Sequence, residues 1–350
     1  MLRVALIFGG ESYEHEVSVA SALSILDNHN PDELELRLFG ISKNGSWLTN
    51  EESISELELV RTSGWGEISG VKSHPILESE SVLAELSDCD VAFPVIHGKG
   101  GEDGRLQGFL DSLHMPYVGS GVAASVSAMD KELMRALFAL NNIPQPPYRV
   151  VRKTDFELDP QIHLNTLIEE LQFPLFTKPA NGGSSIGISK VKNKEELLNA
   201  AKFAFKYDEK ILIENAIDAR EIECGVVEGF TPQFTCAGEI ITLSEFYDYE
   251  NKYRESGTRL VVPADIAEEI SLEIQTLAVK IFRLLGARDY ARVDFLLTDK
   301  DDLYCLEINT SPGFTTSSMF PILCEASGIS YQQLISKLAV TANQNAGTYD

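Results

Sequence analysis

The sequence has few basic residues for its length. Its 350 residues include 29 lysines and arginines against 53 aspartates and glutamates, which gives a formal net charge of −24. Binding to nucleic acid or to an anionic membrane depends on neutralising phosphates with lysine and arginine. The charge balance therefore argues against both partners, and any phosphate that the protein binds must be held by a few locally placed cations.

Long apolar runs are missing too. Only residues 4–8 form an apolar stretch before Gly9 and Gly10, which is too short for the core of a secretory signal. No run approaches the roughly 20 residues of a membrane span. The two glycines also lack the further spacing of a dinucleotide-binding fingerprint.

The five cysteines are odd in number and lack metal-ligand spacing, so they are predicted to be reduced thiols of a cytoplasmic protein.

The domain organisation follows from length and pattern. A chain of 350 residues with 44% apolar content and no biased segment predicts two or three globular domains. Alternating strands and helices predict a small α/β domain with a mostly parallel sheet over residues 1–122. A helix over residues 125–140 and short strands that read as antiparallel predict a central domain over residues 123–215. Residues 216–350 complete a multidomain protein of α/β and α+β class.

Two consecutive strands near the C-terminus form a predicted hairpin. A four-residue turn over residues 299–302, with Thr298 opposite Leu303, would place Asp294 opposite Glu307. A slip of one residue would send the two carboxylates to opposite faces of the hairpin. The other face is predicted to be apolar and buried, with Val293, Phe295, Leu297, Tyr304, Leu306 and Ile308.

The polar face of this hairpin has the composition of a metal site. In the predicted register Arg292 lies opposite Asn309 and joins Asp294 and Glu307 on one face. Two carboxylates repel each other unless cations lie between them. Carboxylate and amide oxygens are hard ligands that suit Mg²⁺ bridged to substrate phosphates. The hairpin therefore predicts a site for a metal-bound phosphate group.

A glycine-rich loop over residues 178–187 joins two predicted strands. Its two adjacent glycines let backbone N–H groups turn toward one point, and Lys178 adds a cation beside them. The pattern is typical of a loop that grips phosphate. An ordinary hairpin turn is the alternative, because paired glycines are common in turns.

The same loop satisfies a serine-esterase pattern through Gly183, Ser185 and Gly187. A nucleophile elbow must lead into a helix, with its histidine later in the chain. Here a strand is predicted over residues 186–191, and the last histidine is His163. The order of these residues in the chain therefore argues against a serine esterase.

Three further segments carry polar or aromatic groups outside regular patterns. Glu14 and Glu16 open a predicted helix, where both favour the positive helix end, and Glu16 could instead recognise an ammonium group. Residues 97–104 are rich in glycine and follow a strand, as active-site loops do. The alternative is a loop without a functional role. Residues 246–253 are aromatic and charged within a long loop, which is typical of a lid.

Taken in order, these segments resemble the D-alanine:D-alanine ligases of the ATP-grasp superfamily, and the resemblance covers essentially the whole chain. It implies an ATP-grasp fold of three domains, with ATP between the central and C-terminal domains, in a homodimer. Each segment is unspecific alone, and eight in the family's order are specific. The matching residues are 8–10 with 14–18, 97–98 with 101–104, 117–121, 129–131, 178–187, 247–249 with 252–253, 292–294, and 307–313.

The resemblance implies roles for individual residues. ATP would be contacted by Lys131, Lys178, Gly183, Ser184, Ser185, Glu214, Ile217, Glu221 and Lys252. Two Mg²⁺ (or Mn²⁺) ions would be held by Asp294, Glu307 and Asn309. The residues that would act on the amino acids and the reacting groups are Glu16, Ser184, Lys252, Tyr253, Arg292, Gly313 and Ser318.

The implied reaction joins two molecules of D-alanine for peptidoglycan synthesis. The first, with its ammonium facing Glu16, would attack the γ-phosphate of ATP and give an acyl phosphate and ADP. The second, held near Lys252 and Ser318, would attack that carbonyl through its amine. Arg292 and the backbone N–H of Gly313 would form the oxyanion hole.

Two other functions remain as hypotheses. One is an ATP-grasp ligase that joins different amino acids, although Tyr253 is typical of the members that form peptides rather than esters. The other is a nucleotide sensor without catalysis. The sequence retains all four polar residues of the hairpin, Arg292, Asp294, Glu307 and Asn309. A protein that no longer catalysed a reaction would not need them, which argues against the sensor.

Overall fold

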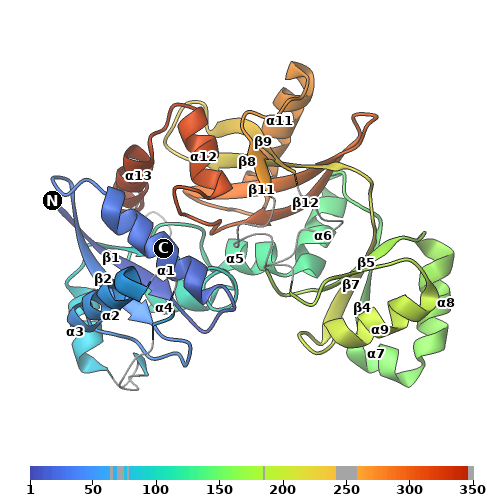
Figure 1. Ribbon diagram of the computed structural model, residues 1–350, viewed down its shortest axis with the longest axis horizontal. Helices are drawn as coiled ribbons and strands as arrows, with labels where there is room; N and C mark the ends of the chain where they lie inside the picture. Colours follow the sequence, from blue (N-terminus) through green and yellow to red (C-terminus); the bar gives the residue numbers. More distant parts are fainter. Residues whose placement is uncertain (64–65, 69–74, 77–78, 184–185, 242–257, 346–350) are drawn as a thin grey trace.

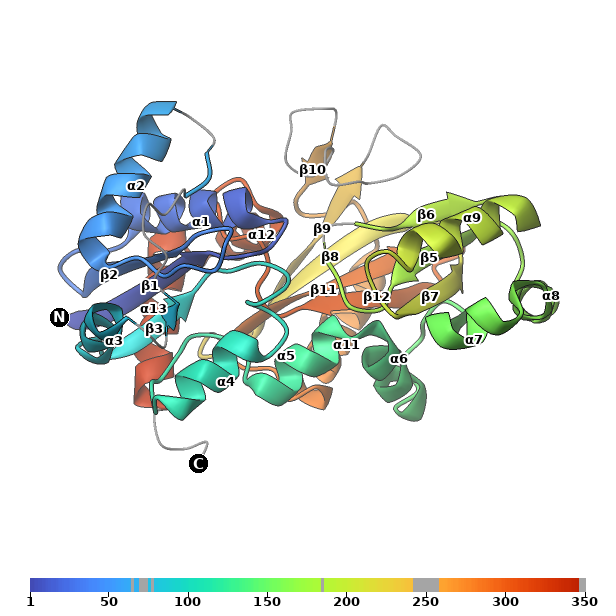
Figure 2. The ribbon, with the colours of Figure 1, turned by 90° about the horizontal axis from the view of Figure 1, so that it is seen from below.

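The computed structural model describes residues 1–63, 66–68, 75–76, 79–183, 186–241 and 258–345. Within these residues it contains three β-sheets, with helices packed against them (Figure 1). The molecule is elongated: the sheet nearest the N-terminus lies at one end, a four-stranded sheet at the other, and a five-stranded sheet between them (Figure 2).

The sheet nearest the N-terminus is parallel, as predicted. β1 (Leu2–Gly9) lies between β2 (Leu34–Ile41) and β3 (Val91–Pro94). Alternate residues of the stretch 4–8 enter two different apolar clusters, so both faces of β1 are buried. The helices of this region are α1 (His15–Asn28), α2 (Asn50–Ser63), α3 (Glu80–Ser87) and α4 (Arg105–Ser112).

The four-stranded sheet is antiparallel, in the order β4-β7-β5-β6. The last strand is shorter than predicted, because Gly187 has a φ of +74° and prolongs the turn before it. The strands are β4 (Tyr148–Arg152), β5 (Leu175–Pro179), β6 (Ser189–Val191) and β7 (Lys210–Asn215). The helices are α7 (Lys153–Leu158), α8 (Pro160–Glu170) and α9 (Lys194–Ala204).

The single helix predicted over residues 125–140 is two helices, α5 (Val122–Met129) and α6 (Lys131–Leu140). Asp130 between them is extended, and its carboxylate accepts two backbone N–H groups in the first turn of α6 at 3.0 and 3.3 Å. An aspartate in this position is a helix N-cap. The apolar periodicity continued across the break, so the prediction missed it.

The five-stranded sheet is antiparallel throughout, in the order β10-β9-β8-β11-β12. Helix α11 (Glu268–Leu284) packs against one face, and α12 (Met319–Ala326) packs against the other, where Gly225 and Gly238 leave room for it. The strands are β8 (Arg220–Val227), β9 (Phe234–Ile241), β10 (Arg259–Val261), β11 (Tyr290–Leu297) and β12 (Leu303–Asn309). The last helix is α13 (Tyr331–Gln344).

The hairpin of β11 and β12 confirms the predicted pairing where the chemistry is expected. Asp294 lies opposite Glu307, and Arg292 lies opposite Asn309. Toward the turn the register differs by one residue, because a β-bulge after Asp294 leaves Leu306 without a partner.

The bulge corrects two parts of the prediction. Leu303 pairs with Leu297 rather than with Thr298, so the connection is longer than four residues. Cys305 and Leu303 enter the apolar core, whereas Tyr304 and Leu306, predicted to be buried, are only partly buried. One inserted residue moves every side chain beyond it to the other face of a strand.

The cysteines are buried thiols, as predicted. All five are unpaired, and only Cys236 is not fully buried. Burial raises the pKa of Cys89 to about 11 and the pKa of Cys224 to about 12, so neither is a reactive thiolate at neutral pH. Within the described residues, no helix combines the length and the apolar character needed to cross a bilayer.

Candidate active site

One polar cavity collects residues from every part of the chain. Its walls come from the N-cap residue of α1, the glycine-rich loop after β3, the junction of α5 and α6, and the loop after β5. The hairpin of β11 and β12 and the segment that follows it complete the lining. The lining residues are Glu14, His97, Glu102, Ala128, Met129, Lys131, Gly182, Gly183, Arg292, Glu307, Ile308, Asn309, Thr310, Ser311, Pro312 and Gly313.

The hairpin holds Asp294 as a buried anion. Arg292 donates to both of its carboxylate oxygens, from Nε and from Nη2, at 2.8 Å each. Asn309 Nδ2 also donates to Oδ2 at 2.8 Å, and Arg292 Nε lies 2.9 Å from Glu223 Oε2. Burial alone lowers the pKa of Arg292, but the charges of Asp294 and Glu223 outweigh it and raise that pKa well above its ordinary value.

Lys131 connects the hairpin to the glycine-rich loop. Its Nζ donates to the carbonyl oxygen of Gly182 at 2.9 Å and lies 3.4 Å from Glu307 Oε2. The break at Asp130 makes this possible, because it starts α6 at Lys131, whose backbone N–H donates to Ala180. A cation between a carboxylate and a glycine-rich loop is suited to binding phosphate.

The donor set of the hairpin fits a magnesium ion. Among the described residues, no three histidine, cysteine, aspartate or glutamate side chains form a metal cage. Mg²⁺ does not need one, because it is usually held by one or two carboxylates together with substrate phosphates. Around the cavity, three carboxylates (Glu223, Asp294, Glu307) surround two cations (Arg292, Lys131), which leaves an excess of negative charge. Asp294, Glu307 and the amide of Asn309 are the oxygens that could hold the metal.

A second charge cluster joins α6 to two strands of the four-stranded sheet. Glu214 on β7 accepts from Arg135 Nη2 at 2.8 Å and is ion-paired through its other oxygen with Lys178 on β5. Burial would raise the pKa of Glu214, but the charges of Lys178 and Arg135 outweigh it and lower that pKa. Arg135 was not identified from the sequence, since nothing local links a helix residue to a strand 79 positions later.

The structure brings Glu14, and not Glu16, to the cavity. Glu16 accepts from Lys43 Nζ at 2.5 Å and does not line the cavity. Glu14 lines it, and close approach by glycines makes room for its carboxylate: a Cβ on Gly98 would lie 2.5 Å from Glu14 Oε2, and one on Gly183 would lie 3.2 Å from it. Glu14 is thus the acidic residue of this segment that lines the cavity, and the role predicted for Glu16 stays a prediction.

Gly313 and Ser318 lie together at the end of the cavity segment. A Cβ on Gly313 would approach Ser318 Oγ to 3.0 Å, so glycine allows this close packing. Ser318 is the N-cap residue of α12, and its Oγ accepts from the backbone N–H of Thr315 at 3.2 Å.

The other predicted site residues fall into two groups. Ile217 follows β7, and Glu221 lies on β8 opposite Leu296, two residues before Glu223 on the same strand face. Neither lines the cavity. Four predicted residues lie outside the described part of the chain: Ser184, Ser185, Lys252 and Tyr253.

His97 and Glu102 also line the cavity, although the sequence indicated only their loop. Burial lowers the pKa of His97, which keeps the ring neutral. Burial and the nearby charge of Glu14 raise the pKa of Glu102 to about 8. Both residues follow β3 at its carboxyl end, where the ligands of parallel sheets gather.

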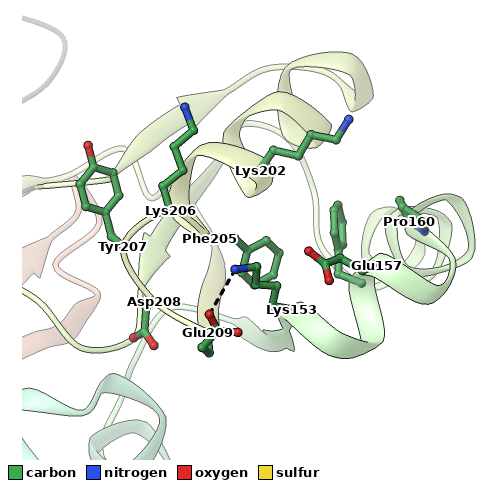
Figure 3. A pocket seen from close by; sticks show the side chains of 10 residues that line it. Lys153, Glu157, Pro160, Lys202, Phe205, Lys206, Tyr207, Asp208 and Glu209 are labelled. Atoms are coloured by element: carbon green, nitrogen blue, oxygen red, sulfur yellow. Dashed lines mark hydrogen bonds and ion pairs between the residues drawn. The ribbon is translucent and has the colours of Figure 1, made fainter.

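A larger cavity of about 770 Å³ lies on the outer side of α7 and α9 (Figure 3). The buried side chains of Phe156 and Phe205 line it, and so do Lys153 and Glu209, which form an ion pair at 3.1 Å. None of the predicted site residues lines it. Size alone therefore does not identify the active site of this protein.

The fold and the polar cavity together define an ATP-grasp enzyme, in which the charged hairpin forms one edge of the five-stranded antiparallel sheet and a second antiparallel sheet carries the glycine-rich loop. Family models for the N-terminus and the C-terminus of D-Ala D-Ala ligase match residues 3–120 and 137–340. The chain belongs to the D-alanine–D-alanine ligase family.

Individual relatives agree with this assignment. The chain is 43% identical over 337 residues to a D-alanine–D-alanine ligase of Halothermothrix orenii, covering 96% of this chain and 97% of the relative. It is 42% identical over 345 residues to one of Natranaerobius thermophilus, covering 97% and 94%.

Solved structures show the same likeness in three dimensions. The D-alanine-D-alanine ligase of Coxiella burnetii superimposes with a TM-score of 0.82 at 29% identity, covering all of this chain and 97% of that one. The VanG D-Ala:D-Ser ligase of Enterococcus faecalis gives a TM-score of 0.80 at 30% identity, covering 98% and 99%. The resemblance that the motifs predicted is thus confirmed over the full length.

Proposed function

We propose that this protein joins two molecules of D-alanine into D-alanyl-D-alanine for peptidoglycan precursor synthesis, with ATP converted to ADP and phosphate. The observation that carries the proposal is the shared polar face of β11 and β12, which opens onto a cavity lined by residues of all three sheet regions. Membership in the D-alanine–D-alanine ligase family over the whole chain supports the substrate.

The first step is the transfer of the γ-phosphoryl group. Lys131 and Lys178 are the cations nearest the glycine-rich loop and would face the phosphates of ATP. Asp294, Glu307 and Asn309 would hold two Mg²⁺ or Mn²⁺ ions, which when bound offset the charge of the phosphates. A carboxylate oxygen of the first D-alanine attacks the γ-phosphorus, the bond from phosphorus to the bridging oxygen breaks, and ADP leaves an acyl phosphate behind.

Glu14 is the residue that we assign to the ammonium group of the first D-alanine, in place of Glu16. Its carboxylate lines the cavity between the loops that carry Gly98 and Gly183. Glu16 already has Lys43 as its counter-ion, at 2.5 Å. The assignment to Glu14 depends on its place in the lining of the cavity, where a substrate ammonium could reach its carboxylate.

The second step forms the peptide bond. The amine of the second D-alanine attacks the acyl carbonyl carbon, and negative charge collects on the carbonyl oxygen. Arg292 and the backbone N–H of Gly313 line the cavity and would stabilise that charge. The carbonyl then re-forms, the bond to the phosphate oxygen breaks, and phosphate leaves with the proton that the amine loses. Ser318, beside Gly313, and Lys252 would hold the carboxylate of the second substrate.

The remaining roles are assigned by family resemblance. Glu214, Ile217 and Glu221 would bind the nucleoside of ATP, with Gly183, Ser184, Ser185 and Lys252 on its phosphates. Ser184 and Tyr253 would close over the first substrate.

We divide the chain into an N-terminal domain (1–122), a central domain (123–215) and a C-terminal domain (216–350). We further propose that the protein is cytoplasmic, because ATP is an intracellular substrate. By family resemblance we also propose a homodimer, and sedimentation of the purified protein measures its mass.

The test is substrate selection. ADP release is measured with D-alanine, D-alanine plus D-serine, D-alanine plus D-lactate, and L-alanine, and the products are identified by mass spectrometry. D-alanyl-D-alanine as the main product is the expected result. Activity with L-alanine but not with D-alanine overturns the proposal. A mixed product with D-serine would assign the chain to the specificity named for the VanG ligase.

A further inference from the structure

The segment that follows β12, residues 311–316, is held in place by side chains from distant parts of the chain. It carries Gly313, whose backbone N–H is proposed for the oxyanion hole. Beyond Gly313, three of its backbone groups are bound by side chains of α1 and α13: Ser21 Oγ accepts from Phe314 N–H at 3.3 Å, Ser24 Oγ accepts from Thr316 N–H at 3.2 Å, and the Tyr331 hydroxyl donates to the carbonyl of Phe314.

Before Gly313, both backbone polar groups of Ser311 are bound by the loop after β3. Glu102 Oε1 accepts from Ser311 N–H at 3.0 Å, and Glu102 Oε2 accepts from Gly98 N–H at 2.7 Å. The Nδ1–H of His97 donates to the Ser311 carbonyl at 2.8 Å, and its Nε2 lies 3.0 Å from Ser21 Oγ. The carboxylate of Glu102 therefore bridges two loops more than 200 residues apart in sequence.

We propose that Glu102 is a positioning residue for the second chemical step, because its bond to Ser311 holds the backbone that aims the Gly313 N–H at the reacting carbonyl. Within the described residues, no acceptor binds the Gly313 N–H, and Gly313 lines the cavity. This inference rests on the proposed ligase reaction.

The physical basis is the geometric demand of an oxyanion hole. A backbone N–H contributes to catalysis only when it lies at hydrogen-bond distance from the oxygen that develops charge. A misplacement of about 1 Å can cost about 100-fold in rate. The first step, attack of a carboxylate on phosphorus, does not use this N–H. Loosening Ser311 should therefore slow peptide formation while sparing the formation of ADP.

Asp103 provides a matched control in the same loop. Its carboxylate accepts from Gly100 N–H at 3.0 Å and from Arg105 N–H at 3.3 Å, and so stabilises only its own loop. Asp103→Asn and Glu102→Gln make the same replacement, of one carboxyl oxygen by an amide nitrogen, at neighbouring positions. Only the second change weakens the bond to Ser311, because one side-chain oxygen is replaced by an amide nitrogen that cannot accept.

The experiment is a single-turnover rapid quench with enzyme in excess over ATP, in which ADP and dipeptide are followed separately. In Glu102→Gln we expect ADP to form within about threefold of the wild-type rate and dipeptide to form about 10- to 100-fold more slowly. In Asp103→Asn both rates should stay within about threefold. Backbone hydrogen exchange over residues 311–316 should be faster in Glu102→Gln than in wild type or Asp103→Asn.

Equal slowing of both steps, or no slowing of either, overturns the role of Glu102. A wild-type protein that makes no dipeptide from D-alanine and ATP refutes the proposed function instead, so the two failures are distinct. If Glu102→Gln does not fold, Glu102→Asp gives the same comparison. It keeps the carboxyl group, but its shorter side chain cannot reach Gly98 and Ser311 together, and the same separation of the two rates is expected.

Discussion

Two clusters of charged side chains near the cavity are built in opposite ways. In the closed cluster of Arg135, Lys178 and Glu214, two cations surround one carboxylate, and Arg135 and Glu214 are only 1% and 2% exposed. In the open cluster of Arg292, Lys131, Glu223, Asp294 and Glu307, three carboxylates surround two cations, and the side chain of Glu307 is 28% exposed.

The difference shows how one binding cleft can handle a metal-bound polyphosphate. The closed cluster has excess positive charge and presents Lys178 beside the glycine-rich loop, which favours an anion. The open cluster has excess negative charge and faces the cavity, which favours a divalent cation. Substitutions in the two clusters should accordingly affect different properties.

The largest effect is expected in the open cluster. Glu307→Gln removes a carboxylate from the proposed metal face, and we expect turnover to fall by roughly a thousandfold, since metal-assisted charge stabilisation is worth several kcal/mol. The melting temperature should change little, because Glu307 is partly exposed. ADP release under saturating ATP measures the first quantity, and calorimetry measures the second. Full activity would remove Glu307 from the mechanism.

The closed cluster should respond in stability. Glu214→Gln leaves Lys178 and Arg135 without their anion in a buried position, which should cost about 3–5 kcal/mol. The control is Glu170→Gln at the exposed ion pair with Arg149, where a change of about 1 kcal/mol or less is expected. Urea unfolding compares the two variants. Similar destabilisation in both would mean that burial does not distinguish these pairs.

A third prediction separates the two glutamates of the first helix. Glu14→Gln removes the proposed partner of a substrate ammonium, and we expect kcat/KM for D-alanine to fall by about 100-fold, in the range found for buried charge pairs. Glu16→Gln breaks only the contact with Lys43 and should change kcat/KM by no more than a few-fold. Initial rates over a range of D-alanine concentrations decide between them, and the reverse order of effects would restore Glu16 to the site.

The smallest predicted effect concerns a buried carboxyl that has no such cluster around it. Burial raises the pKa of Asp289 to about 6, and the bond from Gly119 N–H, at 2.6 Å, only partly opposes this. Between the unfolded pKa of about 4 and the folded pKa, the folded state holds more protons. Stability therefore falls as the pH rises through that interval, by roughly 2–3 kcal/mol.

Asp289→Asn tests this difference. Asparagine still accepts from Gly119 and tolerates the left-handed conformation at this position, where φ is +58°. The melting temperature of the variant, relative to wild type, should rise between pH 4 and pH 7. Parallel pH profiles for the two proteins would show that Asp289 titrates normally in the folded state.

Local patterns predicted much of the fold because they are properties of neighbouring residues. The alternation along β11 and β12 placed Asp294 and Glu307 on one face, and the structure confirms it. The same alternation failed beyond the bulge at Leu306, since an unpaired residue changes the phase of a strand without changing its composition. The break at Asp130 was missed for a similar reason: the apolar period of the two helices runs through it.

Residues that meet from distant parts of the chain were beyond such patterns. Glu14 and Glu16 are equivalent in the sequence, and only the packing of the loops carrying Gly98 and Gly183 distinguishes them. Arg135 reaches Glu214 across 79 positions, and Glu102 reaches Ser311 across 209. Neither contact has a local period that would indicate it.

By itself, then, the sequence determined which side chains share a strand face, which loops are rich enough in glycine to bind phosphate, and which family the chain resembles. Only the tertiary structure decided which acidic residue reaches the cavity, which carboxylate is closed off by two cations, and which side chains hold the backbone around Gly313. The physical reason is that strand and helix periods repeat over a few residues, whereas these contacts depend on how whole sheets and helices pack against one another.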